Sequence, residues 1–297
     1  MTPLPPRPPP PKKKGGCLKW VLLALGGSFM CCCCLSLAAF ENPEDPLEWK
    51  GLQLPDAVPL AGETALGAAL VPADLPEAAA RQYHWRHFVG AWGLGYGLSP
   101  EEHDSVYRHF EALSTRFHFK PGEGTNFTWR PPAECSDKEW KCVFDTMAKD
   151  NADDIAPLTA LFRRVQQERH LNALETTELV VSFVQNITYR LPTEDTAAFG
   201  MLPPAIVVGD GSGDCDSKAL LSVVMLRQLG VDAVMLLGTP LGHAALGVAL
   251  PVSGKKFAHR GVKYAYVEVT APGWAVGKLP PEYDVPLAWK VIPVAVP

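Results

Sequence analysis

The segment Val207–Leu221, VVGDGSGDCDSKALL, places Cys215 between two aspartates, just after a glycine-rich turn and just before an apolar helix. Such a segment is compatible with a phosphate loop, a calcium loop, a metal site or the position of a nucleophile. A phosphate loop requires GxxxxGKS or GxxxxGKT, and no window of the segment supplies either. The dinucleotide fingerprint GxGxxG also fails, because Asp214 stands at the third glycine position.

Metal-binding interpretations fail on specific residues as well. An EF-hand loop starting at Asp210 would have Cys215 where glycine is required and Leu221 where the bidentate glutamate belongs. A zinc site needs clustered Cys and His ligands, which Cys215 lacks. His84 and His87 have no acidic partner in the next turn, and their aromatic surroundings predict a packing or membrane-proximal role. We therefore predict neither a metal nor a cofactor.

A nucleophile fits the segment better. Cys215 precedes SKALLSVVMLRQLG, a predicted buried helix ending at Gly230, whose free N–H groups and dipole favour a thiolate. His243 opens the predicted strand HAALGVAL, and Glu268 lies in the predicted strand YAYVEVT. Antiparallel pairing would place Glu268 beside His243, which completes a nucleophile, a base and an orienting acid. Because Asp214 and Asp216 oppose a low thiol pKa, the His243 pairing must outweigh them.

The pattern of elements predicts the fold class. Helix start signals occur at Ser99-Pro100-Glu101-Glu102 and at Asn172 with Glu175. After the helix that follows Cys215 come short strand-like runs: DAVMLLG, HAALGVALP, KYAYVEVT and AWKVIPVAV. A helix feeding several strands without βαβ alternation predicts an α+β domain, with a central buried helix packed on an antiparallel sheet and a helical region before it.

The C-terminal half also resembles a known family. GDCDSKALLSVVMLRQLGVDAVMLLG, then GHAALGVAL and YVEVTAPGW, is similar to the transglutaminase-like superfamily of papain-fold cysteine enzymes over roughly residues 160–280. By that resemblance Cys215 matches the nucleophile, His243 the base, Glu268 the acid and Thr270 a family threonine. The family usually has aspartate followed by proline where this chain has Glu-Val.

The resemblance implies thioester chemistry on the amide bonds of a protein or peptide substrate. Cys215 and His243 would form a thiolate–imidazolium pair, and water or an amine would complete hydrolysis or acyl transfer. The Cys215 backbone N–H would be one oxyanion donor, and the Gln185 side chain is the candidate for the second.

Two alternatives remain beside this activity. A peptidoglycan-directed cysteine peptidase typically carries DCSG at the nucleophile, whereas this chain has DCDS. A catalytically silent domain of the same fold would serve binding or envelope assembly instead.

The N-terminal residues predict attachment to a membrane. Residues 20–40, WVLLALGGSFMCCCCLSLAAF, carry no charge and are long enough to cross a bilayer as one helix. Basic residues before the span and acidic ones after it predict a cytoplasmic N-terminus and a periplasmic or extracellular body. The length of the run favours an uncleaved signal anchor over a cleavable signal peptide, for which Ser36-Leu37-Ala38 would be the cleavage site.

Charge and cysteine usage agree with an exported body. Five of the 27 Lys and Arg residues lie within residues 1–19, whereas all 32 acidic residues lie beyond them. The body is therefore strongly acidic, which excludes nucleic acid as an expected partner. Cys135 and Cys142 are close enough in sequence to form a disulfide, which an exported compartment permits and which leaves Cys215 as the odd thiol.

These observations divide the chain into five expected regions. They are a basic proline-rich cytoplasmic tail (1–19), a transmembrane helix or signal anchor (20–40), a proline- and alanine-rich linker (41–80), a helical and loop region with the disulfide (81–159) and the transglutaminase-like domain (160–297).

Overall fold

The computed structural model describes residues 62–65, 80–87, 90–122, 127–135, 139–191, 198–285 and 287–297. The expected tail (1–19), the expected membrane span (20–40) and most of the expected linker (41–80) lie outside these ranges. Within the described ranges, no helix has both the length and the apolar character needed to cross a bilayer.

A five-stranded sheet forms most of the C-terminal part of the chain. Its order is β10-β11-β9-β8-β12, and every neighbouring pair is antiparallel, as the sequence predicts. The strands are β8 (Ala233–Gly238), β9 (His243–Val248), β10 (Lys256–His259), β11 (Val262–Val267) and β12 (Lys290–Ile292). Short 3₁₀ turns follow β8 (η4, Thr239–Leu241) and precede β12 (η5, Pro281–Tyr283).

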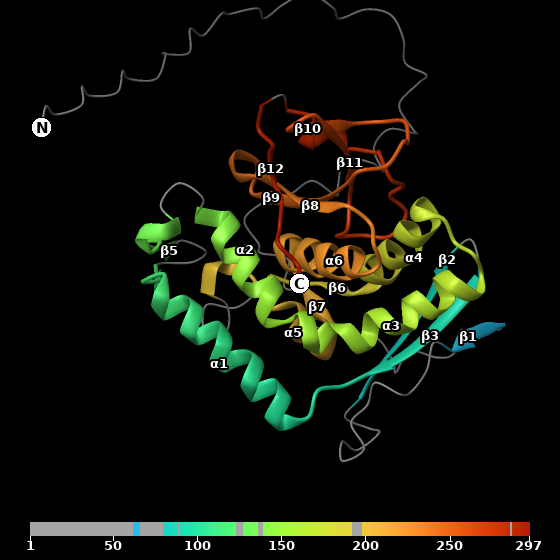
Figure 1. Ribbon diagram of the computed structural model, residues 1–297, viewed down its shortest axis with the longest axis horizontal. Coiled ribbons are helices and arrows are strands. Elements are labelled where there is room, and N and C mark those ends of the chain that lie inside the picture. The colour runs from blue at the N-terminus through green and yellow to red at the C-terminus, as the bar shows by residue number, and fades with distance from the viewer. Residues whose placement is uncertain are drawn as a thin grey trace, which may run out of the picture. The chain divides into compact units, whose positions relative to one another are not determined.

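Helix α6 (Cys215–Gln228) lies at the centre of the fold, between this sheet and the other helices (Figure 1). It contacts β8 and β9 on one side, and it contacts α3 (Ala152–Glu168), α4 (Ala173–Asn186) and α5 (Pro204–Asp210) on others. Since its apolar residues surround the helix axis, burial on all sides is the arrangement that removes most apolar surface from water. The α+β class with a central buried helix on an antiparallel sheet is thereby confirmed.

Both predicted helix starts are present. Helix α1 (Pro100–Arg116) begins after Ser99, whose side chain forms a capping box with Glu102. Helix α4 begins after Asn172, which forms the same motif with Glu175. In each case the side chains satisfy backbone N–H groups that the first turn leaves without a partner.

A second sheet covers part of the helical layer. It has the order β1-β3-β2, with β1 (Glu63–Ala65) parallel to β3 (Gly90–Tyr96) and β2 (Arg81–His87) antiparallel to it. The expected linker therefore contributes a strand, because β1 falls inside it. Of the two roles expected for the aromatic cluster, packing is the one that Trp85 shows, since it is buried and donates to the Ser182 hydroxyl at 3.1 Å.

Residues 81–159, expected to be a helical and loop region, include helix α2 (Glu139–Asp150). The disulfide between Cys135 and Cys142 joins α2 to the 3₁₀ turn η2 (Ala133–Cys135). Helix α3 crosses the expected domain boundary at residue 159, and both α2 and α3 contact α6. Residues on the two sides of that boundary therefore share one core.

Four short strands complete the described structure. Strands β4 (Lys120–Pro121) and β5 (Phe127–Thr128) form an antiparallel pair, and the 3₁₀ turn η3 (Ala198–Gly200) precedes α5. Strand β6 (Thr188–Tyr189) follows α4 and pairs in parallel with β7 (Ser212–Gly213), which lies directly before α6.

Candidate active site

Cys215 is the first residue of α6, as the sequence predicts for a nucleophile at a helix start. Asp214 is the N-cap, and its Oδ1 accepts hydrogen bonds from the Ser217 backbone N–H at 3.1 Å and from the Ser217 hydroxyl. Gly211 ends α5 with a φ of 65°, a left-handed backbone conformation that residues with a side chain rarely adopt. The turn therefore needs glycine at this position, and it fixes where the thiol enters the site.

His243 and Glu268 meet directly. His243 is the first residue of β9, and Glu268 follows the last residue of β11, which is the neighbouring strand. The distance from His243 Nε2 to Glu268 Oε2 is 3.0 Å, and both side chains are buried. Glu268 was expected within the strand YAYVEVT, but β11 ends at Val267, and Glu268 is the next residue.

Five donors hold the Glu268 carboxylate in place. Oε1 accepts from the backbone N–H groups of Val269 and Thr270, each at 3.0 Å, and from the Thr270 hydroxyl at 2.6 Å. Oε2 accepts from the Tyr266 hydroxyl at 2.6 Å in addition to its contact with His243. The expected importance of Thr270 thus has a geometric basis, since it supplies two of these donors.

This network keeps Glu268 ionised. Burial alone would raise the pKa of Glu268, but the hydrogen bond and charge of His243 oppose it, together with the bonds from Thr270 and Tyr266. The net result lowers the pKa from 4.5 to about 2. The group beside the imidazole is therefore a fixed anion, which orients the ring through the contact with Nε2.

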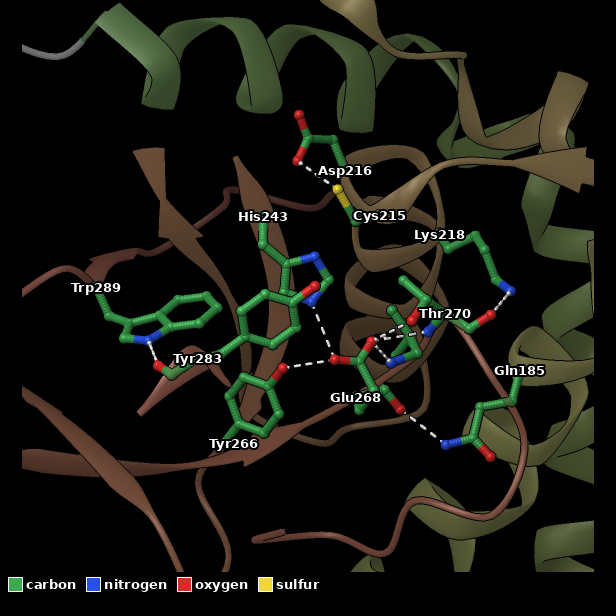
Figure 2. A network of polar contacts seen from close by, with 11 residues as sticks. Gln185, Cys215, Asp216, Lys218, His243, Tyr266, Glu268, Thr270, Tyr283 and Trp289 are labelled. Atoms are coloured by element: carbon green, nitrogen blue, oxygen red, sulfur yellow. Dashed lines mark hydrogen bonds and ion pairs between the residues drawn. The ribbon is translucent and has the colours of Figure 1, made fainter. Parts of the chain in front are cut away.

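The thiol lies on the opposite side of the imidazole from Glu268. In Figure 2 the His243 ring stands between Cys215 and Glu268, with Nε2 directed to the carboxylate and the other ring nitrogen on the side of the sulfur. The backbone N–H of Ala244, the residue after His243, bonds to the sulfur and favours its charged form. The order Cys215, His243, Glu268 predicted from the sequence is thus a spatial order as well.

The thiol proton is nevertheless directed elsewhere. Cys215 donates to Asp216 Oδ1, with 3.7 Å between sulfur and oxygen, and no side-chain hydrogen bond joins Cys215 to His243 in the described part of the chain. Burial, then the charges of Asp216 and Asp214, raise the pKa of the Cys215 thiol above its ordinary value. The expected opposition from the two aspartates is therefore present in this geometry.

Asp216 itself responds to the crowding of negative charge. Burial and the neighbouring charge of Asp214 raise the pKa of Asp216 from 3.8 to about 7, although the bond from Cys215 opposes the rise. Near neutral pH, a large fraction of this carboxyl is protonated. A protonated Asp216 carries no charge, and it therefore raises the pKa of the Cys215 thiol less than the ionised carboxylate does.

Two aromatic residues cover the imidazole, and the sequence interpretation missed both. Tyr283 stacks on His243 with 4.2 Å between ring centroids and an interplanar angle of 17°, and Trp289 meets the ring edge-on at 6.0 Å. The Trp289 indole donates to the Tyr283 carbonyl at 3.0 Å, which fixes the pair (Figure 2). No local motif links these residues to His243, because they lie about 40 residues away.

Gln185 does not occupy the expected position. Its amide nitrogen donates to the backbone carbonyls of Glu268 at 2.8 Å and Trp274 at 3.1 Å, on the side of Glu268 away from the thiol (Figure 2). The amide hydrogens are thus committed to holding the segment after β11. The prediction that Gln185 supplies an oxyanion donor is wrong for this geometry, and we assign it a structural role.

Metal-ligating side chains do not cluster at this site or elsewhere in the described ranges. The arrangement of a thiol, an imidazole and a carboxylate instead has the parts needed for nucleophilic catalysis. Comparisons with models of protein families, with curated proteins and with solved structures yield no match to this chain.

Proposed function

We propose that this chain is a transglutaminase-like cysteine enzyme of the papain fold, which attacks peptide amide bonds through a thioester. The observation that carries the proposal is the ordered contact of His243 with Glu268 at 3.0 Å, with Cys215 on the other side of the ring. A fixed carboxylate, an oriented imidazole and a thiol at a helix start are the components of an activated cysteine.

In the proposed reaction, His243 takes the proton of the Cys215 thiol, and the sulfur attacks the amide carbonyl carbon. The imidazolium then gives its proton to the leaving amine, and a thioester remains on Cys215. Water hydrolyses the thioester, or a second amine takes the acyl group. The Cys215 backbone N–H at the start of α6 is the proposed oxyanion donor.

A protein or peptide substrate is favoured by the surroundings of the site. Tyr189 lies on β6 within electrostatic reach of both Cys215 and Tyr283, and it is 43% exposed. Leu191 on the same segment and Val285 after Tyr283 are also exposed. Exposed apolar side chains on the segments that carry Tyr189 and Tyr283 suit a polypeptide chain better than a small polar molecule.

The alternative is a catalytically silent domain of the same fold, used for binding or envelope assembly. One observation favours it: the thiol donates to Asp216 and its pKa is raised, which describes an unreactive cysteine. Membrane anchoring through residues 20–40, with the body outside the cytoplasm, stays a prediction from the sequence under either function.

The deciding experiment measures the reactivity of Cys215 toward a peptide carrying an electrophilic ketone in place of the scissile amide. The full chain is labelled and the modified peptide identified by mass spectrometry, which separates Cys215 from the N-terminal cysteines. We expect modification faster than that of a free thiol and a loss of roughly 100-fold in His243→Ala.

His259→Ala is the matched control, because His259 lies on β10 and has no contact with Cys215 or Glu268 among those described above. A wild-type rate equal to that of a free thiol, unchanged by His243→Ala, would leave the silent domain as the answer.

A further inference from the structure

Lys218 is a fully buried lysine that the proposed reaction does not use. It lies on α6, three residues after Cys215 and therefore close to one helical turn from it. Its ammonium donates to the backbone carbonyl of Ile187 at 2.7 Å. It also donates to the backbone carbonyl of Thr270 at 3.0 Å (Figure 2). The first acceptor lies at the end of α4, and the second lies in the segment that holds Glu268.

Burying an ammonium group is unfavourable unless its donors are satisfied. Burial lowers the pKa of Lys218 from 10.5 to about 7, while the negative charge of Glu268 acts in the opposite direction. An apolar residue of similar length would fill the same space without this desolvation cost. The two hydrogen bonds and the attraction to Glu268 are therefore what a lysine adds at this position.

The hydrogen bond from Lys218 to Thr270 is linked to Glu268 and His243 by further contacts. The Thr270 backbone N–H and hydroxyl both donate to Glu268 Oε1, while its carbonyl accepts from Lys218. Glu268 in turn contacts His243. One side chain on the helix that bears the nucleophile thus restrains the residue that holds the acid.

The bond to Ile187 restrains the other side of the site. Ile187 is followed directly by β6, which pairs with β7, and β7 lies directly before Asp214 and Cys215. Lys218 therefore connects α6, the end of α4 and the segment after β11 at a single buried point. These segments carry Cys215, the start of β6 and Glu268.

We propose that Lys218 is a positioning residue, whose ammonium ties α6 to the Thr270 backbone and so keeps Glu268 in contact with His243. The proposal rests on the proposed function only where it predicts reactivity, because the Glu268–His243 contact is measurable without catalysis. If Lys218 acts by positioning Glu268, the effect of replacing Lys218 depends on Glu268. A purely structural role would not depend on Glu268.

The first test observes the contact itself. His243 in the ¹⁵N-histidine-labelled full chain is assigned by comparison with His243→Ala, and its Nε2 shift is compared between wild type, Lys218→Met and Lys218→Arg. Lys218→Met should move the shift toward that of Glu268→Gln, and Lys218→Arg should restore much of the difference. A wild-type shift in a folded Lys218→Met chain would overturn the proposal.

Lys263→Met is the matched control, because Lys263 is an exposed lysine on β11 and loses the same charge. Its Nε2 shift should equal that of the wild type. If Lys218→Met does not fold, Lys218→Gln replaces it, because glutamine keeps a neutral donor at the position. A wild-type Nε2 shift in both Lys218→Gln and Lys218→Arg would then overturn the proposal.

The second test separates positioning from general loss of structure. Lys218→Met should slow labelling of Cys215 about tenfold in the wild-type background and less than about twofold in the Glu268→Gln background, since coupled residues are not additive. Equal losses in both backgrounds would indicate a structural role and overturn the proposal. Should wild-type labelling show no dependence on His243, the proposed function fails, while the Nε2 shift still decides the role of Lys218.

Discussion

At the scale of single residues, the cysteine and its two aspartates determine how reactive the site is. The thiol is buried, and the charges of Asp216 and Asp214 raise its pKa. The Ala244 and Asp216 backbone N–H groups oppose this effect. If substrate binding turned the thiol from Asp216 toward His243, the proposed base could take the thiol proton.

Replacing Asp216 with asparagine should make Cys215 more reactive. Asp216→Asn removes the largest charge that raises the thiol pKa and keeps a side chain of similar shape, so the pKa should fall. We expect alkylation of Cys215 by iodoacetamide at about pH 9, where the Asp216 carboxyl of the wild type is ionised, to accelerate roughly tenfold, because one pKa unit changes the thiolate fraction by that factor.

The pH dependence of the alkylation rate is the measurement for this change. Asp210→Asn is the control, because Asp210 is an exposed carboxylate at the end of α5 that leaves the thiol environment unchanged. A pH profile of Asp216→Asn that coincides with the wild-type profile would show that Asp216 does not govern the thiol.

At the scale of elements, helix α4 begins at an N-terminal cap that Asn172 forms. The Asn172 side chain accepts from the backbone N–H groups of Leu174 and Glu175, at 2.9 and 3.0 Å. Asn172→Ala should lower the free energy of unfolding by about 1 kcal/mol, as is typical of an N-cap. Urea denaturation followed by circular dichroism measures the loss.

Asn186→Ala is the control for this cap, because Asn186 lies at the other end of α4 and donates to a carbonyl within the same helix. A loss in Asn172→Ala no larger than in Asn186→Ala would mean that the cap contributes little to stability.

The elements also show which features the sequence makes predictable. The starts of α1 and α4 follow from capping boxes, which are local, and the central helix follows from its all-round apolar pattern. Cys215, His243 and Glu268 were identified from residue types at element boundaries. Their meeting depends on the pairing of β9 with β11, which an antiparallel arrangement predicts.

Features that depend on long-range packing were not predictable in this way. Tyr283 and Trp289 cover His243 because the chain returns to the sheet as β12, and nothing in their local sequence indicates that return. A lysine is ordinarily expected at the surface. In the fold, however, Lys218 is buried and donates to the backbone carbonyls of Ile187 and Thr270. Gln185 was assigned by its place on the upstream helix, whereas its contacts point the other way.

At the scale of the whole molecule, one core joins regions that the sequence separates at residue 159. Phe144 on α2, and Ile155 and Leu158 on α3, belong to the same buried cluster as the apolar residues of α6. Removing α2 and the first half of α3 would expose several of those α6 residues to water, and each large apolar side chain exposed costs about 2 kcal/mol.

We therefore expect a fragment of residues 160–297 to lack a stable fold. Thermal unfolding of this fragment by circular dichroism should show no cooperative transition, whereas a chain of residues 62–297, which keeps every described element, should unfold cooperatively. A cooperative transition of the shorter fragment at the same temperature would mean that residues 160–297 form an independent domain.

Acid stability of the folded chain should reflect the buried Glu268. Its pKa is lowered from 4.5 to about 2 in the folded state, so the unfolded chain binds its proton first as the pH falls. The stabilisation is complete above pH 4.5 and disappears as the pH approaches 2. A difference of this size corresponds to about 3 kcal/mol, which Glu268→Gln should lose at neutral pH.

The difference in unfolding free energy between wild type and Glu268→Gln should therefore shrink as the pH is lowered from about 5 to about 2. Urea titrations at several pH values measure it, with Glu282→Gln, on the η5 turn, as an exposed carboxylate control that should show no such trend. A difference that stays constant over this range would mean that Glu268 is not held as an anion by His243, Thr270 and Tyr266. In that case the imidazole would lack the fixed charge on which the proposed mechanism depends.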